Sequence, residues 1–165
     1  MSAIQELAFG DVEMELAKTR IVLSRIPDEH LDWQPHEKSM TLGALGAHIV
    51  NMLFWQHVAL EANEFDLASV PPGQDRTPDS TQQLLDTFEK HVDKLRDLMA
   101  GMTEESLEET WTLRMGEQVV FQMPRATVFR MGFSHIAHHR GQMTVFFRLL
   151  GVPVPNTYGP TADEE

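Results

Sequence analysis

Apolar residues recur every three or four positions along four segments of the chain, and this spacing predicts four amphipathic helices. The segments cover residues 3–26, 41–64, 80–100 and 124–150. Pro27 ends the first of them, because a proline disfavours helical backbone in the residue before it. Thr41 and Ser80 are suitable N-cap residues for the second and third helices. Pro124 belongs to the first turn of the fourth helix, and Gly151 terminates that helix.

The predicted helices are long enough to form a bundle. Each has about 20–27 residues and spans about 30–40 Å, so the expected fold class is all-α, a four-helix bundle. Residues 110–123 alternate between apolar and polar side chains around Gly116, which predicts a small β-hairpin between the third and fourth helices. The proline-rich stretch 152–160 is incompatible with a regular helix or a central strand. A chain of 165 residues is expected to form a single domain, residues 1–165.

Composition and charge exclude several classes of protein. Hydrophobic residues make up 42% and charged residues 23% of the chain, as in folded globular domains. No apolar run reaches the roughly 20 residues that span a bilayer, and the N-terminus lacks the features of a signal peptide. We therefore expect a cytoplasmic protein without a membrane partner. A formal net charge of −12 disfavours nucleic-acid binding, and the absence of cysteine excludes disulfides, thiolate metal sites and a cysteine nucleophile.

The face of the fourth predicted helix that should point into the bundle is polar at its centre. His135 and His139 lie on this face between apolar residues such as Val128 and Phe146. The two histidines are four positions apart, so they lie about one turn apart on the same side of the helix. His48 occupies an equivalent inward position on the second predicted helix. Imidazoles therefore stand where leucines would be expected.

Three inward imidazoles on two helices predict a metal site. Burying them without partners is costly, and a metal ion removes that cost because each ring nitrogen gains a bond of about 2.0–2.1 Å if the ion is zinc. We therefore expect His48, His135 and His139 to be the ligands. The alternative is that they are core histidines held by hydrogen bonds. His91, on an inward stripe of the third predicted helix, is a candidate fourth ligand, and His138 is a candidate contact to substrate or solvent.

Two stretches of the sequence resemble a known family. They are Thr41-Leu-Gly-Ala-Leu-Gly-Ala-His48 and Ser134-His-Ile-Ala-His-His-Arg-Gly-Gln142. Both resemble the DinB/YfiT-like family of metalloproteins, and the H-x-x-x-H-R-G-Q string is the most specific part of the match. Trp33-Gln-Pro35 and the ending Val154-Pro-Asn-Thr-Tyr-Gly-Pro160 are also similar to this family. The resemblance thus covers nearly the whole chain.

The resemblance implies a particular bundle and a metal site. The four helices would run up-down-down-up, and one divalent ion per chain would be held by His48, His135 and His139. Members of the family are often homodimers. Characterised relatives include thiol-dependent transferases and isomerases, and many others are regarded as metal-dependent hydrolases. Zinc and nickel are the ions most expected, with iron, copper or cobalt as alternatives, because three histidines suit all of these metals.

The distribution of acidic residues favours thiol transfer over hydrolysis. Residues 124–151 contain four arginines and no Asp or Glu, and the chain has no H-E-x-x-H motif, so the predicted ligand helices lack the glutamate base of zinc proteases. We expect a metal-dependent transferase that acts on a small-molecule substrate with a low-molecular-weight thiol. One alternative is hydrolysis of an amide or ester, which requires an inward carboxylate, and another is non-catalytic binding of a metal or small ligand. The candidate carboxylates are Glu13, Glu15, Glu89 and Asp93.

Three further residues are candidates for substrate binding. Asn51 and Gln142 each lie about one turn beyond a predicted ligand, where they are able to orient a substrate or a bound water. Tyr158 belongs to the C-terminal tail, which folds over the site or packs on the end of the bundle. Arg140 lies off the inward stripe of its helix, and we expect it to form a surface or interface salt bridge, with substrate binding as the alternative.

Overall fold

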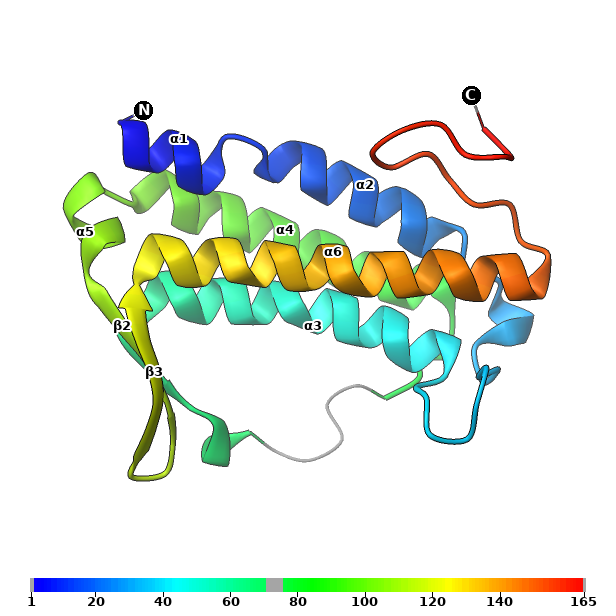
Figure 1. Cartoon of the computed structure of the whole chain (residues 1–165), viewed down its shortest axis with the longest axis horizontal. Coiled ribbons are helices and arrows are strands. Elements are labelled where there is room, and N and C mark those ends of the chain that lie inside the picture. Colours follow the sequence, from blue (N-terminus) through cyan, green and yellow to red (C-terminus); the bar gives the residue numbers. More distant parts are fainter. Residues whose placement is uncertain (1, 71–75, 165) are drawn as a thin grey trace.

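The computed structural model describes residues 2–70 and 76–164, and this part of the chain is mostly helical with a small three-stranded sheet (Figure 1). In chain order its elements are α1 (Ala3–Phe9), α2 (Val12–Ser24), the 3-10 helix η1 (Asp28–His30), α3 (Leu42–Glu61), β1 (Glu64–Asp66), the 3-10 helix η2 (Leu67–Ser69), α4 (Thr81–Gly101), α5 (Glu104–Glu108), β2 (Thr110–Met115), β3 (Gln118–Pro124) and α6 (Arg125–Leu150). Within these ranges, no helix combines the length and the apolar character that a bilayer crossing requires.

The first predicted helix is in fact two helices, so the prediction of one continuous helix over residues 3–26 is wrong. α1 ends at Phe9 and α2 begins at Val12, with Gly10 and Asp11 between them. Glycine weakens a helix interior because its backbone loses the most conformational entropy on ordering. The last residues of α1 and the first of α2 are buried in the same core, so the break leaves the apolar face of the segment continuous.

Four long helices, α2, α3, α4 and α6, lie side by side (Figure 1). α3 packs against α4 and α6, and α2 packs against the same two helices. The sequence colours of Figure 1 show that α2 and α6 run in one direction along the long axis of the molecule. They also show that α3 and α4 run in the opposite direction. Aliphatic side chains and phenylalanines fill the space between them. Almost fully buried examples are Leu53, Phe88, Leu95, Phe129 and Phe133.

The predicted hairpin is confirmed as the antiparallel pair β2–β3. It turns at Gly116, whose φ of 58° lies in the left-handed region that glycine adopts without strain. β1 pairs in parallel with β2, which gives the sheet order β1-β2-β3. The sequence analysis did not predict this strand, because a strand of three residues is too short to show an alternating pattern.

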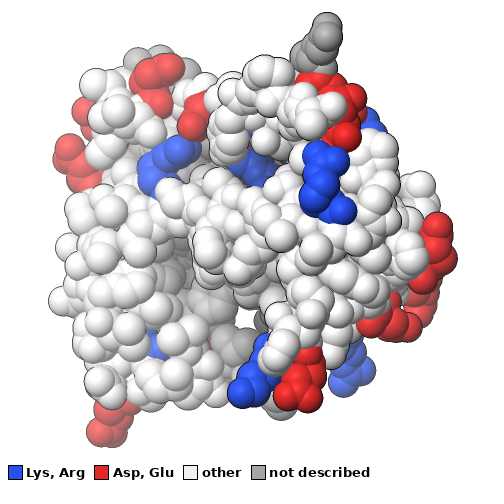
Figure 2. Space-filling view, turned by 45° about the vertical axis from the view of Figure 1, so that its right-hand side comes forward, with Lys and Arg blue, Asp and Glu red and all other residues white. Residues whose placement is uncertain are grey.

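Most charged side chains lie on the surface. In the face shown in Figure 2, they gather mainly toward the edges, and the hollow at the centre has mainly uncharged walls. Surface ion pairs include Arg20 with Glu89 and Arg96 with Glu13. Exposed pairs of this kind contribute about 0–1 kcal/mol each. The two buried arginines of α6 have a larger structural role.

Arg140 is the first of these buried arginines, and the prediction of a surface position for it is wrong. It is 2% exposed, and its guanidinium donates to the Glu15 carboxylate, to the Thr19 hydroxyl at 3.1 Å and to the Tyr158 hydroxyl at 2.5 Å. The Tyr158 hydroxyl in turn donates to the Glu15 carboxylate at 2.7 Å. Burial raises the pKa of Glu15, but the hydrogen bonds from Tyr158 and Arg140 outweigh it, so the net pKa is lowered. This network ties α6 and the C-terminal tail to α2.

Arg125, the first residue of α6, is the second buried arginine and is 3% exposed. Its Nη1 donates to the carbonyl oxygens of Ala59 and Ala62, each at 2.7 Å, and its Nε donates to the carbonyl oxygen of Ser106 at 2.8 Å. Its Nη2 contacts the Glu109 carboxylate at 2.9 Å. The last carbonyl groups of a helix have no partner within that helix. One side chain therefore ties the start of α6 to the ends of α3 and α5.

Replacing Arg125 with leucine should lower the free energy of unfolding by about 3 kcal/mol, because several buried carbonyl groups lose their hydrogen-bond donor at once. Chemical denaturation followed by circular dichroism measures this change. The control is Arg96→Leu, whose exposed pair with Glu13 is expected to contribute at most about 1 kcal/mol. Equal losses in the two variants would contradict the structural role assigned to Arg125.

Candidate metal centre

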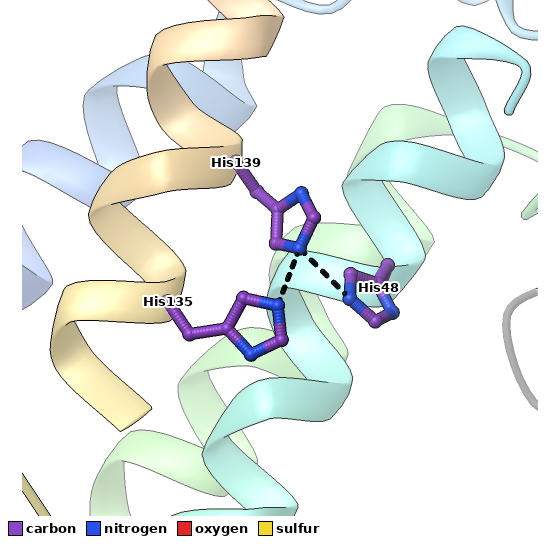
Figure 3. A group of neighbouring side chains, drawn as sticks. All are labelled: His48, His135 and His139. Atoms are coloured by element: carbon purple, nitrogen blue, oxygen red, sulfur yellow. Dashed lines mark hydrogen bonds between the residues drawn. The ribbon is translucent and has the colours of Figure 1, made fainter. Parts of the chain in front are cut away.

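Three histidine side chains from two helices converge on one point (Figure 3). His48 comes from α3, and His135 and His139 come from α6. The Nε2 atom of His139 lies 2.8 Å from Nε2 of His135 and 3.1 Å from Nε2 of His48. The candidate ligand atoms of all three residues lie within 4.8 Å of one another. The structure thus brings together the three histidines that the sequence analysis selected as metal ligands.

The packing of α3 against α6 produces this convergence. His135 and His139 are one turn apart on α6, and their ring centroids are 4.6 Å apart. Gly132 lies one turn before His135, and a Cβ added there would be 1.5 Å from Nε2 of Gln56 on α3. Glycine therefore leaves the space that the Gln56 side chain occupies. The close approach of the two helices at this point brings His48 within reach of the histidines of α6.

The geometry of the cluster fits a divalent ion. Three nitrogens bound tetrahedrally to zinc at about 2.0–2.1 Å lie about 3.4 Å apart, so the Nε2 pairs at 2.8 and 3.1 Å would separate by about 0.3–0.6 Å around one ion. Among the described residues, this cluster holds three ligands and no carboxylate. Structural zinc sites usually have four protein ligands, whereas three ligands leave open positions for water or substrate. The cluster therefore has fewer protein ligands than a structural zinc site usually has.

The cluster lies near the surface of the molecule. His135 is exposed, and His48 and His139 are partly buried. These rings are therefore less buried than predicted from the sequence, and the helical spacing is the stronger indication of the cluster. Exposure of this degree also gives a substrate access to the open coordination positions.

Gln142 contacts one of the three histidines directly. Its Oε1 lies 2.8 Å from Nδ1 of His139. When Nδ1 carries the proton and donates it to Gln142, Nε2 keeps its lone pair for a metal ion. Burial lowers the pKa of both His135 and His139, and the charge of His48 lowers both further, although the bond to Gln142 offsets part of the shift at His139. The lowered pKa values favour the neutral rings that bind metal.

The structure places the proposed fourth ligand, His91, outside this cluster. Its ring packs against the ring of His57 with a centroid distance of 5.1 Å, and Nε2 of His57 donates to the His91 carbonyl oxygen at 2.9 Å. Burial, together with His57, lowers the pKa of His91 to about 4. His138 is exposed, and its ring centroid is 4.9 Å from that of His139. Neither His91 nor His138 belongs to the convergent group.

A cavity of about 630 Å³ lies beside the cluster, and His48 and His135 form part of its wall. Its other walls come from α3, η2, the hairpin and α6. They include Trp55, Gln56, Trp111, Leu113, Phe121 and Val128. The sequence analysis missed this cavity. The available signal was the pair Trp111 and Leu113, which are two positions apart and therefore share one face of a strand.

Two of the three predicted substrate-binding residues lie at the site. Asn51 lines the cavity one turn beyond His48, and Gln142 contacts His139. Tyr158 does not line the cavity, because its hydroxyl group is held in the buried network of α2 and α6 described above. The tail therefore packs on α2 and α6 through Tyr158 and not over the cavity.

The four carboxylates considered as general bases are placed elsewhere. They form the ion pairs Glu13–Arg96, Asp93–Arg96, Glu89–Arg20 and Glu15–Arg140. None of them belongs to the histidine cluster, and none lines the cavity. Within the described residues, a carboxylate-dependent mechanism therefore has no support from the geometry.

Purified protein without a histidine tag is expected to contain about one divalent ion per chain, as three convergent imidazoles imply. His48→Ala, His135→Ala and His139→Ala should each lose this ion, measured by mass spectrometry of the metal content. The control is His138→Ala, which removes an exposed imidazole adjacent to the cluster and should retain the ion. Full metal content in all three ligand variants would contradict the assignment.

Replacing Gln142 with leucine should lower metal affinity by about 10–100-fold while the three ligands remain, because His139 loses the partner that fixes its tautomer. Competition with a chelator of known affinity measures the change. Gln142→Glu keeps an acceptor oxygen and should retain the wild-type affinity or exceed it. Identical affinities for the leucine and glutamate variants would show that the hydrogen bond has no effect on the ion.

Comparisons with known proteins place the chain in a family. The sequence model of the DinB superfamily matches residues 12–143. The uncharacterized protein YrdA of Bacillus subtilis (strain 168) is 29% identical over 154 residues, which cover 92% of this chain and 86% of YrdA. A DinB-like protein from Bacillus cereus ATCC 10987 has a similar crystal structure, with a TM-score of 0.72 and 23% identity over 92% of this chain and 95% of that one. The DinB-like protein YjoA from Bacillus subtilis gives a TM-score of 0.62 and 17% identity over 92% of this chain and 93% of that one. The chain therefore belongs to the DinB superfamily.

Proposed function

We propose that the chain holds one divalent metal ion with His48, His135 and His139 and transfers a low-molecular-weight thiol to a small electrophilic substrate. The observation that carries this proposal is an accessible three-histidine cluster beside a cavity whose described lining residues include no carboxylate. Such a site favours a nucleophile that the ion itself activates, since no described carboxylate lies there to remove a proton.

His48, His135 and His139 would hold a divalent ion as neutral imidazoles, and such an ion would supply a full positive charge that favours the thiolate form of a thiol at neutral pH. The sulfur then forms a bond to an electrophilic carbon of the substrate. The bond from that carbon to the leaving group breaks, and the leaving group departs with the electron pair. The proton of the thiol passes to solvent. No carboxylate base is needed in this reaction.

Residues of this chain support the reaction in different ways. Gln142 holds His139 as the tautomer whose Nε2 binds an ion. Asn51 lines the cavity beside His48, where its uncharged amide is able to orient a polar group of the substrate. Zinc and nickel suit this donor set best, and iron, copper or cobalt are also compatible with three imidazoles.

Hydrolysis of an amide or ester is the alternative reaction for the same cluster. It would use an Asp or Glu near the ion as a base, and the carboxylates considered for that role pair with arginines outside the cluster. Non-catalytic metal binding would fit a closed site better than an accessible one. Thiol transfer therefore has more support from the geometry than either alternative.

We further propose that α2, α3, α4 and α6 form an up-down-down-up four-helix bundle and that two copies associate as a homodimer in the cytoplasm. The opposite directions of α2 and α6 relative to α3 and α4 support this course (Figure 1). Exposed apolar side chains on α1 and α2 support association. Leu7 of α1 is 78% exposed, and Met14 and Ile21 of α2 are 51% and 42% exposed. Met14 and Ile21 are seven residues apart, so they lie on one side of α2.

Cobalt-substituted protein tests thiol activation directly. Addition of glutathione or cysteine should produce sulfur-to-cobalt charge-transfer absorption, and the chain has no cysteine of its own to produce that band. His135→Ala should lose the band together with the ion, and the control His138→Ala should retain it. An unchanged spectrum at saturating thiol would overturn the proposal.

Product analysis then separates the two reactions. We expect benzyl chloride and glutathione to form a thioether conjugate at a rate that depends on the ion, measured by mass spectrometry. Phenyl acetate should be hydrolysed no faster than by metal-free protein. Ion-dependent ester hydrolysis without any thiol would replace the transferase proposal with the hydrolase.

A further inference from the structure

The cavity beside the cluster is larger than a metal-bound water or a small thiol group requires. Its volume of about 630 Å³ lies in the range of roughly 300–1,000 Å³ that is typical of small-molecule sites. Because His48 and His135 form part of its wall, a molecule in the cavity lies directly against two of the proposed metal ligands. This position connects the cavity to the reaction at the cluster.

Aromatic side chains from two parts of the fold form walls of the cavity. Trp55 of α3 packs edge-to-face on Phe65 with a centroid distance of 4.6 Å, and Trp111 of β2 lies 6.1 Å from Phe121 of β3. These contacts restrain the rings, so the aromatic walls are preformed. A further aromatic ring packs well on such walls at centroid distances of about 4.5–7 Å.

The described residues that line the cavity include no Lys, Arg, Asp or Glu. A charged group that entered would lose its hydration without gaining a counter-charge from the described residues. An uncharged apolar group has no such penalty and gains from leaving water. The composition of the walls therefore selects uncharged ligands.

Two polar atoms among these walls lack partners. Oε1 of Gln56 and Nε1 of Trp111 belong to side chains that line the cavity, and both atoms are buried without a hydrogen-bond partner in the described part of the chain. Buried polar atoms of this kind are uncommon, because each one loses its hydrogen bonds to water. They offer one acceptor and one donor to a ligand that enters the cavity.

We propose that this cavity binds the uncharged aromatic group of the substrate and holds it against the histidine cluster. The inference rests on the proposed function, because it names the class of electrophile that receives the thiol. That class consists of small, uncharged molecules with an aromatic group, and excludes substrates whose aromatic part carries a carboxylate or ammonium group.

Binding of the uncharged fluorescent amine N-phenylnaphthylamine tests the proposal without any reaction. Its emission should rise on binding to wild-type protein, both metal-free and zinc-loaded. In the metal-free protein, where benzoate has no ion to bind, benzyl alcohol should displace the probe at least about tenfold more effectively than benzoate. Equal displacement by benzoate, or no probe binding, would overturn the proposal.

Two valines of α6 provide a matched pair of variants. Val128 lines the cavity, whereas Val145 is 57% exposed and does not line it. Val128→Asp should weaken probe binding by about tenfold or more, and Val145→Asp should change it by less than about twofold. Circular dichroism reports whether each variant folds. If Val128→Asp does not fold, Val128→Phe narrows the same cavity without a charge and should also weaken binding. Wild-type affinity in a folded Val128 variant would overturn the assignment.

Failure of this inference is distinguishable from failure of the proposed function. If the probe binds as expected but cobalt-substituted protein shows no thiolate band, the aromatic site remains and thiol transfer is wrong. If the thiolate band appears and conjugates form, but Val128→Asp leaves probe binding unchanged, thiol transfer remains and the aromatic site is wrong.

Discussion

The register between α3 and α6 is the constraint on which the candidate site depends. Metal–ligand distances tolerate errors of about 0.2 Å, whereas a shift of one residue along a helix moves a side chain by about 1.5 Å. The three imidazoles therefore converge only in one register of α6 along α3. Arg125 ties the start of α6 to the end of α3, and Arg140 ties its later part to α2. The two ligands of α6 lie between these buried arginines.

Neighbouring residues of α6 have separate roles because a helix rotates about 100° per residue. His139 points toward His48 of α3, as Figure 3 shows, whereas Arg140 is buried against Glu15 and Thr19 of α2. A single stretch of helix thus supplies a metal ligand on one side and a structural anchor on the other. The same rotation explains why the helical spacing identified His139 but wrongly predicted a surface position for Arg140. The spacing shows which residues share one face of a helix. It does not show which neighbouring helix packs on the other faces.

Local patterns in the sequence predicted the long helices and the hairpin, because each of these depends on the spacing of apolar residues within one segment. The histidine cluster was predicted because its members lie on the apolar faces of two helices. The interruption at Gly10 and Asp11 was missed because the apolar spacing continues across it. β1 was missed because its stability comes from pairing with β2, which follows more than forty residues later. The cavity walls and the contacts of Tyr158 likewise join distant segments, and no local pattern reports such contacts.

The histidine cluster and one wall of the cavity come from different parts of this chain. The three histidines belong to α3 and α6, whose relative position is set by buried contacts between helices. The aromatic wall opposite these helices comes from Trp111 of β2 and Phe121 of β3, which contribute no ligand to the cluster. The hairpin lines the cavity but contributes no histidine to the cluster. Substitutions at its inward-facing positions are therefore able to alter the shape and polarity of the cavity while the three imidazoles keep their geometry. The helices therefore set the geometry of the histidine cluster, and the hairpin shapes the cavity together with α3 and α6.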